Sequence, residues 1–293
     1  MIITKLQGGL GNQMFQYAMG FALARHMNVP LYYDSSWFNE SFDPAIVTPR
    51  SFSLDIFRLS GQPADAALVK QFFPAPHWPD KIWHRLKRIL GAEALLYEQQ
   101  PGYDSSILAK ARKNSYLQGY WQSAAYFSNV EQALRQEFQF VEQAASPYTA
   151  QIAAAALPVA IHVRRGDYAH NATTQSIHGL LTPAYYQQGI ALLQQALGNG
   201  IDWFIFSDDP AWCSAAFASL PNHIIVDSSS YPHWYDMQLM STCKHHIIAN
   251  SSYSWWGAWL AAHATQRVVA PAQWCATMQA IPRHMHPAHW ETI

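Results

Sequence analysis

Along residues 154–293, short apolar runs alternate with longer segments in which apolar positions recur at a helical period. The apolar runs have the length of buried strands, and the longer segments have the length of helices. Strands that alternate with helices of about 10 to 15 residues are typical of a parallel sheet with helices on both faces. This half therefore predicts a doubly wound, Rossmann-like α/β domain with strands at residues 158–163, 202–207, 223–226, 245–249 and 267–270.

The first half opens with a strand–loop–helix–strand unit. Strands are predicted at residues 1–6 and 29–33 and a helix at residues 14–27, because its apolar positions fall on one helical face. Residues 35–100 mix Pro, Trp and His with short apolar runs, which predicts irregular structure and short helices. Within them, the basic amphipathic stretch 81–90 favours a solvated helix face over a membrane contact.

A stretch rich in Ala and Gln separates the two halves. It covers residues 143–158 and contains Pro147 and Pro158. We place the domain boundary within it, and expect an N-terminal α/β domain over residues 1–153 and a C-terminal Rossmann-like domain over residues 154–293.

Composition and charge narrow the class of protein. Charged residues make up only 13% of the chain and the net charge is -1, which argues against a nucleic-acid-binding protein. The three cysteines show no CxxC spacing and are expected to be free thiols in a reducing compartment. Because the sequence shows neither a signal peptide nor an apolar run of about 18 residues, we expect a cytoplasmic protein with at most peripheral membrane contact.

The clearest candidate site follows the strand at residues 158–163. The segment His162-Val163-Arg164-Arg165-Gly166-Asp167-Tyr168 places two arginines at the C-terminal end of that strand, where ligands bind in open α/β sheets. Guanidinium groups offer fixed forks of donors that suit a phosphate or a diphosphate. An Arg–Asp surface ion pair is the alternative; the strand, the glycine and the flanking His162 and Tyr168 favour an anion site.

The loop Gly8-Gly9-Leu10-Gly11-Asn12-Gln13 lies between a predicted strand and a predicted helix, an arrangement that can cradle a phosphate. A dinucleotide-binding fingerprint would need a third glycine where Met14 stands. A purely structural turn and a loop that contacts substrate or nucleotide both remain open. Asn12 and Gln13 make the loop unusually polar for a turn alone.

Other strand ends of the second half bring polar residues to the same edge of the sheet. Asn250, Ser251 and Ser252 precede a helix, which is both a capping pattern and a phosphate-binding pattern. The arginines on the neighbouring strand favour the anion site. Asp208 and Asp209 precede Pro210 and most simply cap the next helix.

Two further features bear on the ligand. Asp236 lies within a predicted helix, and its carboxylate could be exposed or could accept hydrogen bonds from a guanine edge; spacing alone favours exposure. No Asp-x-Asp or His-x-x-x-His ligand pattern is present, so we expect no metal site. Two arginines can neutralise a diphosphate without a cation.

Five segments together resemble the successive motifs of bacterial α-1,2-fucosyltransferases, glycosyltransferase family 11. They come in the family's order and cover nearly the whole chain. The segments are Gly8-Gly9-Leu10-Gly11-Asn12-Gln13-Met14-Phe15-Gln16-Tyr17-Ala18, Gly119-Tyr120-Trp121-Gln122-Ser123, His162-Val163-Arg164-Arg165-Gly166-Asp167-Tyr168, Phe206-Ser207-Asp208-Asp209 and Ala249-Asn250-Ser251-Ser252-Tyr253-Ser254-Trp255-Trp256-Gly257-Ala258.

The resemblance implies a GT-B-like fold with an acceptor-side N-terminal domain and a GDP-fucose-binding C-terminal domain. It implies inverting transfer of L-fucose from GDP-β-L-fucose, without metal or other cofactor, to O2 of a terminal β-galactose on an O-antigen, lacto-N-biose or lactose-type glycan. By similarity, Arg164 and Arg165 hold the diphosphate and His162 approaches the nucleoside. Asp236 lies sixteen residues before Ser252, a spacing that resembles the guanine-reading Asp and phosphate-binding Ser of the related α-1,6-fucosyltransferases. The remaining donor-binding candidates are Gly9, Gly11, Asn250, Ser251 and Ser252.

The Gly-x-Gly-Asn loop also resembles the protein-O-fucosyltransferase loop, which implies that Asn12 lies beside the reacting sugar. The candidate base of the α-1,6-fucosyltransferases lies ten residues after the motif His; Ala172 stands there in this sequence, so that role does not carry over. Asp167 is our first candidate for the base, although it could instead hold an arginine in place. Acceptor contacts are expected from Gln13, Trp37, Trp121, Gln122 and Tyr168. The alternatives are a GT-B transferase for another nucleotide sugar and a non-catalytic glycan-binding protein.

Overall fold

The computed structural model describes residues 1–43, 48–73, 78–166, 175–176, 179–278 and 281–293, which form two compact units. Unit 1 comprises Met1–Val141 with Pro282–His286, and unit 2 comprises Glu142–Ile281 with Pro287–Ile293. The boundary expected at residue 153 instead falls inside helix α6 (Pro147–Ala154). That helix belongs to unit 2 because the chain before it is tied there: Gln238 accepts from the Ala144 N–H and donates to the Glu142 carbonyl.

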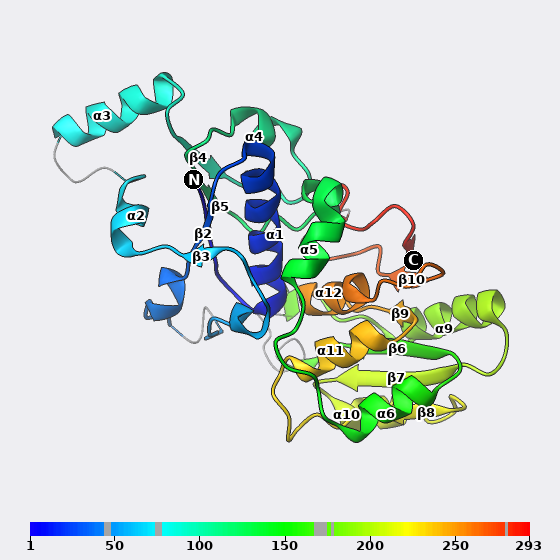
Figure 1. Cartoon of the computed structure of the whole chain (residues 1–293). Coiled ribbons are helices and arrows are strands. Elements are labelled where there is room, and N and C mark those ends of the chain that lie inside the picture. The colour runs from blue at the N-terminus through cyan, green and yellow to red at the C-terminus, as the bar shows by residue number, and fades with distance from the viewer. Residues whose placement is uncertain (44–47, 74–77, 167–174, 177–178, 279–280) are drawn as a thin grey trace. The chain divides into compact units, whose positions relative to one another are not determined.

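Unit 1 is built on a five-stranded parallel sheet in the order β3-β2-β1-β5-β4 (Figure 1). The strands are β1 (Ile2–Lys5), β2 (Leu31–Asp34), β3 (Gln62–Pro63), β4 (Ala94–Tyr97) and β5 (Ser115–Gln118). The helices are α1 (Leu10–Met27), α2 (Ala66–Lys70), α3 (Trp78–Ile89), α4 (Ser105–Lys110) and α5 (Glu131–Glu137), with 3-10 turns at Ser36–Asn39, Leu54–Ile56, Ala124–Tyr126 and Ser128–Val130.

Helix α1 differs from the pattern that predicted it. The helix begins at Leu10, inside the glycine-rich loop, and nearly every residue as far as Ala24 is buried. The loop is therefore the first turn of the helix, with Gly9 as its N-cap. Burial on all sides makes α1 the central element of unit 1 rather than a helix with one apolar face.

Unit 2 contains a six-stranded parallel sheet in the order β11-β10-β9-β6-β7-β8. Its strands are β6 (Pro158–Val163), β7 (Asp202–Ser207), β8 (His223–Ile225), β9 (His245–Ile247), β10 (Val268–Ala270) and β11 (Glu291–Thr292). In the part of unit 2 that the structure describes, α6 is followed by α9 (Pro183–Leu197), α10 (Pro210–Ala216), α11 (Tyr235–Thr242) and α12 (Ser252–Leu260).

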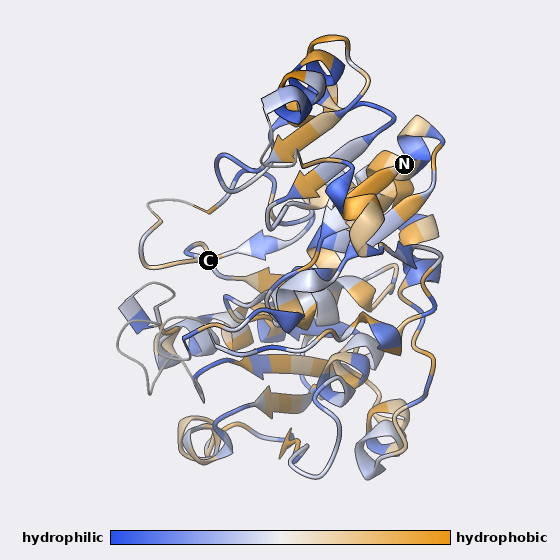
Figure 2. Cartoon of the chain, turned by 90° about the vertical axis from the view of Figure 1, so that its left-hand side faces the viewer, coloured by the Kyte–Doolittle hydropathy of each residue, from blue (hydrophilic) through white to orange (hydrophobic). Residues whose placement is uncertain are grey.

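Numbered within the unit, the strand order is 3-2-1-4-5-6, that of a dinucleotide-binding Rossmann fold. Val159, Ile161 and Ile205 lie in a core that α9 covers, and Figure 2 shows apolar residues concentrated in the central strands. The predicted fold class is therefore confirmed: α/β, GT-B-like in having two Rossmann-like domains, with a doubly wound parallel sheet in the C-terminal half.

Two properties of the described residues bear on later sections. No helix among them is long and apolar enough to cross a bilayer. Cys213, Cys243 and Cys275 are free thiols and are all buried.

Candidate functional site

The strand order of unit 2 fixes where a ligand would bind. Strands β6 and β9 are neighbours, and the chain continues from them toward opposite edges of the sheet. In open α/β sheets, ligands bind outside the carboxyl ends of the strands at such a switch point. The segment from His162 to Gly166 follows β6, and Asn250 to Ser252 follow β9, so the structure brings these two predicted groups to the switch point.

Asp208, at the end of the adjacent strand β7, organises the arginine loop. Its carboxylate pairs with the Arg164 guanidinium at 2.6 Å and accepts the backbone N–H of Arg165 at 2.8 Å. Burial opposes its ionisation, but Arg164 and the backbone donors of Gly166 and Arg165 hold the pKa of Asp208 below its usual value. A Cβ on Gly166 would lie 2.6 Å from an Asp208 oxygen, so a larger residue there would have to displace this carboxylate.

Arg165 is fixed in orientation by two side chains of the β7–α10 connection. Its Nε lies 3.2 Å from an Asp209 oxygen, and its guanidinium stacks 4.4 Å from the centre of the Trp212 ring. Asp209 also accepts the Trp212 N–H as the N-cap of α10, which confirms the capping role predicted for it. The two terminal nitrogens of the Arg165 guanidinium donate no hydrogen bond to any residue that the structure describes.

Both arginines are therefore paired with carboxylates. From the sequence, an ion pair and an anion site were alternatives, whereas the structure allows both at once. Two guanidinium charges and two carboxylate charges, Asp208 and Asp209, sum to zero. The loop acts as an oriented set of donors rather than as a patch of net positive charge. Among the described residues, the Arg165 guanidinium is hydrogen-bonded only through Nε, so its two terminal nitrogens can still donate to an anion.

The N-terminus of α12 offers donors at the same switch point. Ser251 is the N-cap residue, yet its side chain makes no capping hydrogen bond. Within the described chain, the hydroxyls of Ser251 and Ser252 bond to nothing. Ser254, by contrast, accepts the Ala249 N–H at 2.9 Å, which fixes the turn, and buried Trp255 anchors the helix. Unused hydroxyls and free helix N–H groups suit an anion better than they suit a cap.

Asn250 and His162 lie deeper at this edge. Asn250 is buried and donates to the Trp274 carbonyl at 3.3 Å. His162 is 7% exposed, and its ring packs 5.8 Å from that of Tyr253. Burial, with a smaller contribution from Arg164, lowers the pKa of His162 to about 4 against the opposing effect of Asp208, so the imidazole is neutral at pH 7. Its Nδ1 is buried and has no hydrogen-bond partner among the described residues.

Asp236 is not the exposed carboxylate that its spacing favoured. It lies in the first turn of α11, where Oδ2 accepts from the Ser228 hydroxyl at 2.9 Å. Oδ1 is buried and bonds to no described residue. Burial raises the pKa of Asp236 to about 6, against the Ser228 hydrogen bond. Tyr253 ties this turn to α12, since its hydroxyl accepts the Met237 N–H at 2.8 Å.

Unit 1 has a switch point of its own between β1 and β5, and two of the motifs meet there. Gly8 has φ 76°, a conformation that favours glycine, and Gly9 begins α1 with Gly11 buried in its first turn. Gln122, after β5, donates to the Asn12 side-chain oxygen at 2.8 Å. The structure therefore brings together the predicted Asn12 and Gln122.

Gln13 is not available to an acceptor. Its side chain is completely buried, and its amide donates to the carbonyls of Gly8 and Ser51, both at 2.9 Å, while accepting the Ser53 N–H at 3.0 Å. The prediction that Gln13 contacts the acceptor is wrong, because both ends of its amide are already hydrogen-bonded to the backbone of Gly8, Ser51 and Ser53.

Trp121 is likewise a core residue. It is 0% exposed, has φ 56° and packs edge-on against Tyr126. Trp37 is half-buried against the rings of Phe38 and Phe42. The acceptor-stacking prediction is wrong for Trp121 and stays a prediction for Trp37. Asp167 and Tyr168 lie outside the described residues.

Glu98, which follows β4, is a residue that the sequence did not single out. Its carboxylate accepts the backbone N–H groups of Tyr120 and Trp121, at 2.6 and 3.1 Å, and so holds the left-handed turn that leads to Gln122. Burial raises the pKa of Glu98 despite these donors. Its position just after a strand could have identified Glu98 from the sequence, but residues 35–100 show no pattern that locates that strand.

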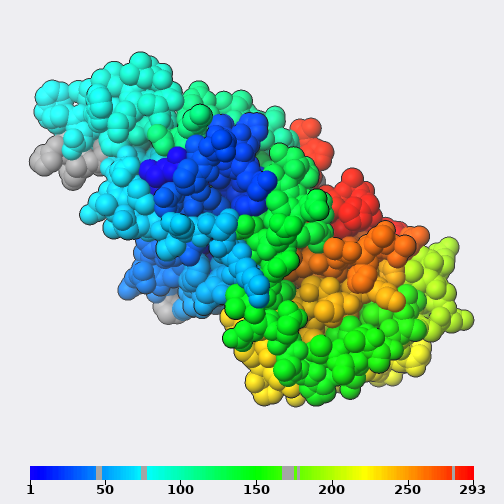
Figure 3. Space-filling model, in the orientation of Figure 1, coloured from blue at the N-terminus to red at the C-terminus, as the bar shows by residue number. Residues whose placement is uncertain are grey.

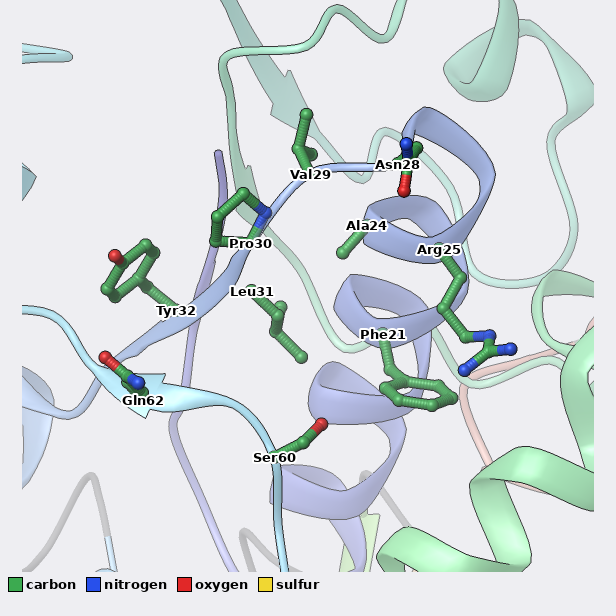
Figure 4. Close-up of a pocket in the computed structure, with 10 residues that line it drawn as sticks. All are labelled: Phe21, Ala24, Arg25, Asn28, Val29, Pro30, Leu31, Tyr32, Ser60 and Gln62. Atoms are coloured by element: carbon green, nitrogen blue, oxygen red, sulfur yellow. The ribbon is translucent and has the colours of Figure 1, made fainter.

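A pocket of about 720 Å³ lies elsewhere in unit 1 (Figure 4). It is formed where α1 ends and β2 begins, with Phe21, Arg25, Leu31 and Gln62 in its lining. This is the end of the sheet opposite the strands' carboxyl ends, so we do not assign it to the switch-point site. In the described residues, no group of three or more His, Cys, Asp or Glu is arranged to hold a metal ion.

The family model and the sequence relatives of this chain agree on one family. Residues 84–292 match the family model for glycosyl transferase family 11. An alpha-1,2-colitosyltransferase of Escherichia coli is 30% identical over 282 residues, covering 93% of this chain and 92% of the relative. The Escherichia coli O-antigen biosynthesis glycosyltransferase WbnK is 32% identical over 291 residues, with 92% and 94% covered. The solved structure of NodZ alpha-1,6-fucosyltransferase soaked with GDP-fucose aligns with TM-score 0.47 and 15% identity over 88% of this chain and 91% of that one.

Proposed function

The chain belongs to glycosyl transferase family 11 and is a glycosyltransferase, and from that premise we propose that it is a galactoside α-1,2-fucosyltransferase. The proposed reaction moves L-fucose from GDP-β-L-fucose to O2 of a terminal β-galactose, with inversion and without a metal ion. The acceptor is a galactose-terminated glycan of the O-antigen, lacto-N-biose or lactose type.

One observation carries the proposal: the switch point of unit 2 combines anion donors and a carboxylate oxygen that no described residue engages. Arg165 and the start of α12, at Ser251 and Ser252, supply donors for a diphosphate. Asp236 supplies a buried oxygen that no described donor reaches. Guanine presents N–H donors along its Watson–Crick edge, whereas adenine presents an acceptor at the corresponding ring nitrogen. A carboxylate therefore favours a guanine nucleotide.

The chemistry follows from the charges that develop. Attack by the galactose O2 on the anomeric carbon forms the new glycosidic bond as the bond to the β-phosphate breaks, and GDP leaves with the electron pair. Donors already oriented toward that phosphate stabilise the transition state by several kcal/mol, roughly 3 for a single donor. Arg165 suits this role because Asp209 and Trp212 hold its guanidinium in one orientation before substrate arrives.

The acceptor hydroxyl must lose its proton in the same step. We assign that proton to the Asp167 carboxylate, which stays a prediction. Asn12, held by Gln122, is proposed to contact the transferred sugar. His162 is neutral and so suits a hydrogen bond to the nucleoside rather than a charge on the diphosphate.

The colitosyltransferase among the relatives favours one alternative, a colitosyl donor. The decisive experiment incubates the protein with GDP-L-fucose, GDP-colitose, GDP-mannose or UDP-galactose in the presence of EDTA, with lactose and lacto-N-biose as acceptors. We expect turnover with GDP-fucose and an α-1,2 linkage by NMR. Turnover with GDP-colitose alone would show that the transferred sugar is colitose and not fucose. Turnover only with UDP-galactose would contradict the guanine assignment. Activity that EDTA abolishes and Mg²⁺ or Mn²⁺ restores would contradict metal independence.

A further inference from the structure

Helix α3 presents an apolar face to solvent. Among its residues only His84 is buried. Figure 3 shows the segment, in cyan, at the surface of unit 1. Its large side chains are exposed to an extent unusual for their type: Trp78 72%, Ile82 47%, Trp83 58%, Leu86 44% and Ile89 70%, followed by Leu90 at 79%.

These side chains form one continuous face. At about 100° of rotation per residue, these six apolar side chains fall within an arc of about 140° around the helix axis. The centre of that arc lies opposite His84. The exposed apolar residues are therefore a single stripe along the helix rather than scattered side chains.

The side of α3 that faces the protein is polar. His84 Nδ1 lies 2.7 Å from a Glu93 oxygen, and Lys87 and Arg88 lie 3.8 and 3.6 Å from the same carboxylate. Arg88 also donates to the Phe72 carbonyl at 3.0 Å. The helix is thus attached through charges and hydrogen bonds, and its apolar stripe is directed away. This arrangement reverses that of an ordinary surface helix.

Charge distinguishes among the possible occupants of this face. Within α3, Lys81, Arg85, Lys87 and Arg88 outnumber the one acid, Asp80, by three, although the whole chain carries a net charge of -1. Lys81 and Arg85 border the stripe, are exposed, and pair with no acid in the described chain. In a symmetric dimer through this face, the basic borders of both copies would approach one another and repel.

We propose that α3 binds the surface of an anionic lipid bilayer, with its axis in the plane of the interface. Trp78 and Trp83 are the residue type that concentrates at the interface between headgroups and acyl chains. Lys81 and Arg85 meet the lipid phosphates while the apolar stripe enters the acyl boundary. The helix has 12 residues, a length of about 18 Å, so it lies on a membrane and does not span one.

Vesicle co-sedimentation of the full chain tests this. We expect binding to vesicles of phosphatidylcholine with 30% phosphatidylglycerol that is far stronger than binding to phosphatidylcholine alone. Lys81→Gln with Arg85→Gln should weaken binding to the anionic vesicles by about 5-fold for each charge. Trp78→Gln with Ile89→Gln should weaken it by about 10-fold or more. The control Lys110→Gln with Lys113→Gln removes the same charge from exposed sites outside α3 and should leave binding unchanged.

Three results would overturn the proposal. One is equal binding to neutral and anionic vesicles. Another is equal weakening by the control pair, which would indicate an effect of net charge alone. The third is a dimer, seen by light scattering without lipid, that Trp78→Gln with Ile89→Gln converts to a monomer; the stripe would then be an interface between copies. Urea denaturation of each variant confirms that the substitutions at these exposed positions leave the fold intact.

Discussion

Replacing Asp236 with asparagine should make the free protein more stable and, at the same time, impair nucleotide binding. Asp236 has a buried oxygen that accepts no hydrogen bond from any described residue, and burial raises its pKa from an ordinary 3.8 to about 6. The ionised side chain therefore opposes folding. Asparagine keeps the shape and the contact with Ser228 but carries no charge.

The size of the effect follows from the pKa. A rise from 3.8 to about 6 corresponds to a penalty of about 3 kcal/mol once the carboxyl is ionised in both states. Partial solvent access reduces this figure, so we expect a gain of about 1 to 3 kcal/mol for Asp236→Asn at pH 8. Below pH 3.8 the folded and unfolded chains both hold the proton and the gain vanishes. The gain grows as pH rises from 3.8 to about 6 and is constant above that, so at pH 5 it should be about half its full value.

Urea denaturation at pH 5 and pH 8 measures the stability, and calorimetry with GDP measures binding. Loss of a charged hydrogen-bond acceptor should weaken the binding of GDP by about 10- to 100-fold. Asp227→Asn is the matched control, because Asp227 is exposed and accepts hydrogen bonds from the Ser229 hydroxyl and from the Ser229 N–H, which lower its pKa. The control should gain no stability and bind GDP normally. An Asp236→Asn protein that is less stable than the parent at pH 8 and binds GDP as tightly would refute both the buried charge and the guanine contact.

Four further predictions concern the phosphate donors, a helix cap and the sugar. Arg165→Ala should reduce kcat by at least about 100-fold with an unchanged urea midpoint, because its guanidinium serves the leaving phosphate and not the core; near-normal turnover would contradict that role. Ser251→Ala with Ser252→Ala should weaken GDP binding by about 5- to 10-fold without loss of stability, since neither hydroxyl caps α12. Asp209→Ala removes the N-cap of α10 and should lower the free energy of unfolding by about 1 kcal/mol in the same urea assay. Gln122→Ala should lower kcat about 10-fold and leave GDP affinity intact, because it releases the Asn12 side chain; a loss of GDP affinity instead would mean that the pair acts on the nucleotide.

Sequence periodicity predicted the unit 2 sheet well because each element there is local. The strands at residues 158–163 and 202–207 have the bounds that their apolar runs predicted, and α9 begins at Pro183 as its Thr-Pro start indicated. The Asp209 cap is also local, since donor and acceptor are three residues apart. Such features are encoded within a few residues of themselves.

Polar side chains whose partners are distant in the sequence were predicted poorly. Gln13 reaches Ser51 and Ser53, nearly forty residues away, so nothing near Gln13 indicates that its amide is already engaged. Trp121 is buried by contacts that form only when β5 joins its sheet. The return of Pro282–His286 to unit 1 depends on similar contacts, such as the Ser123 hydroxyl donating to the His284 carbonyl at 2.6 Å.

The orientation of a helix is a second kind of information that a pattern lacks. The stretch 81–90 is amphipathic in sequence, and the usual expectation is that its charged side faces solvent. The structure places the polar side against Glu93 and leaves Trp78 and Ile89 exposed. Periodicity identifies two faces, but tertiary contacts decide which one faces outward.

The central claim is that the switch point between β6 and β9 binds the diphosphate of a guanine nucleotide. A crystal structure of the GDP complex tests it most directly. The account predicts phosphate oxygens within hydrogen-bond distance of Arg165 and of the Ser251–Ser252 start of α12, with the guanine edge on Asp236. GDP bound at the glycine-rich loop of unit 1, with no phosphate contact to Arg165, would contradict it.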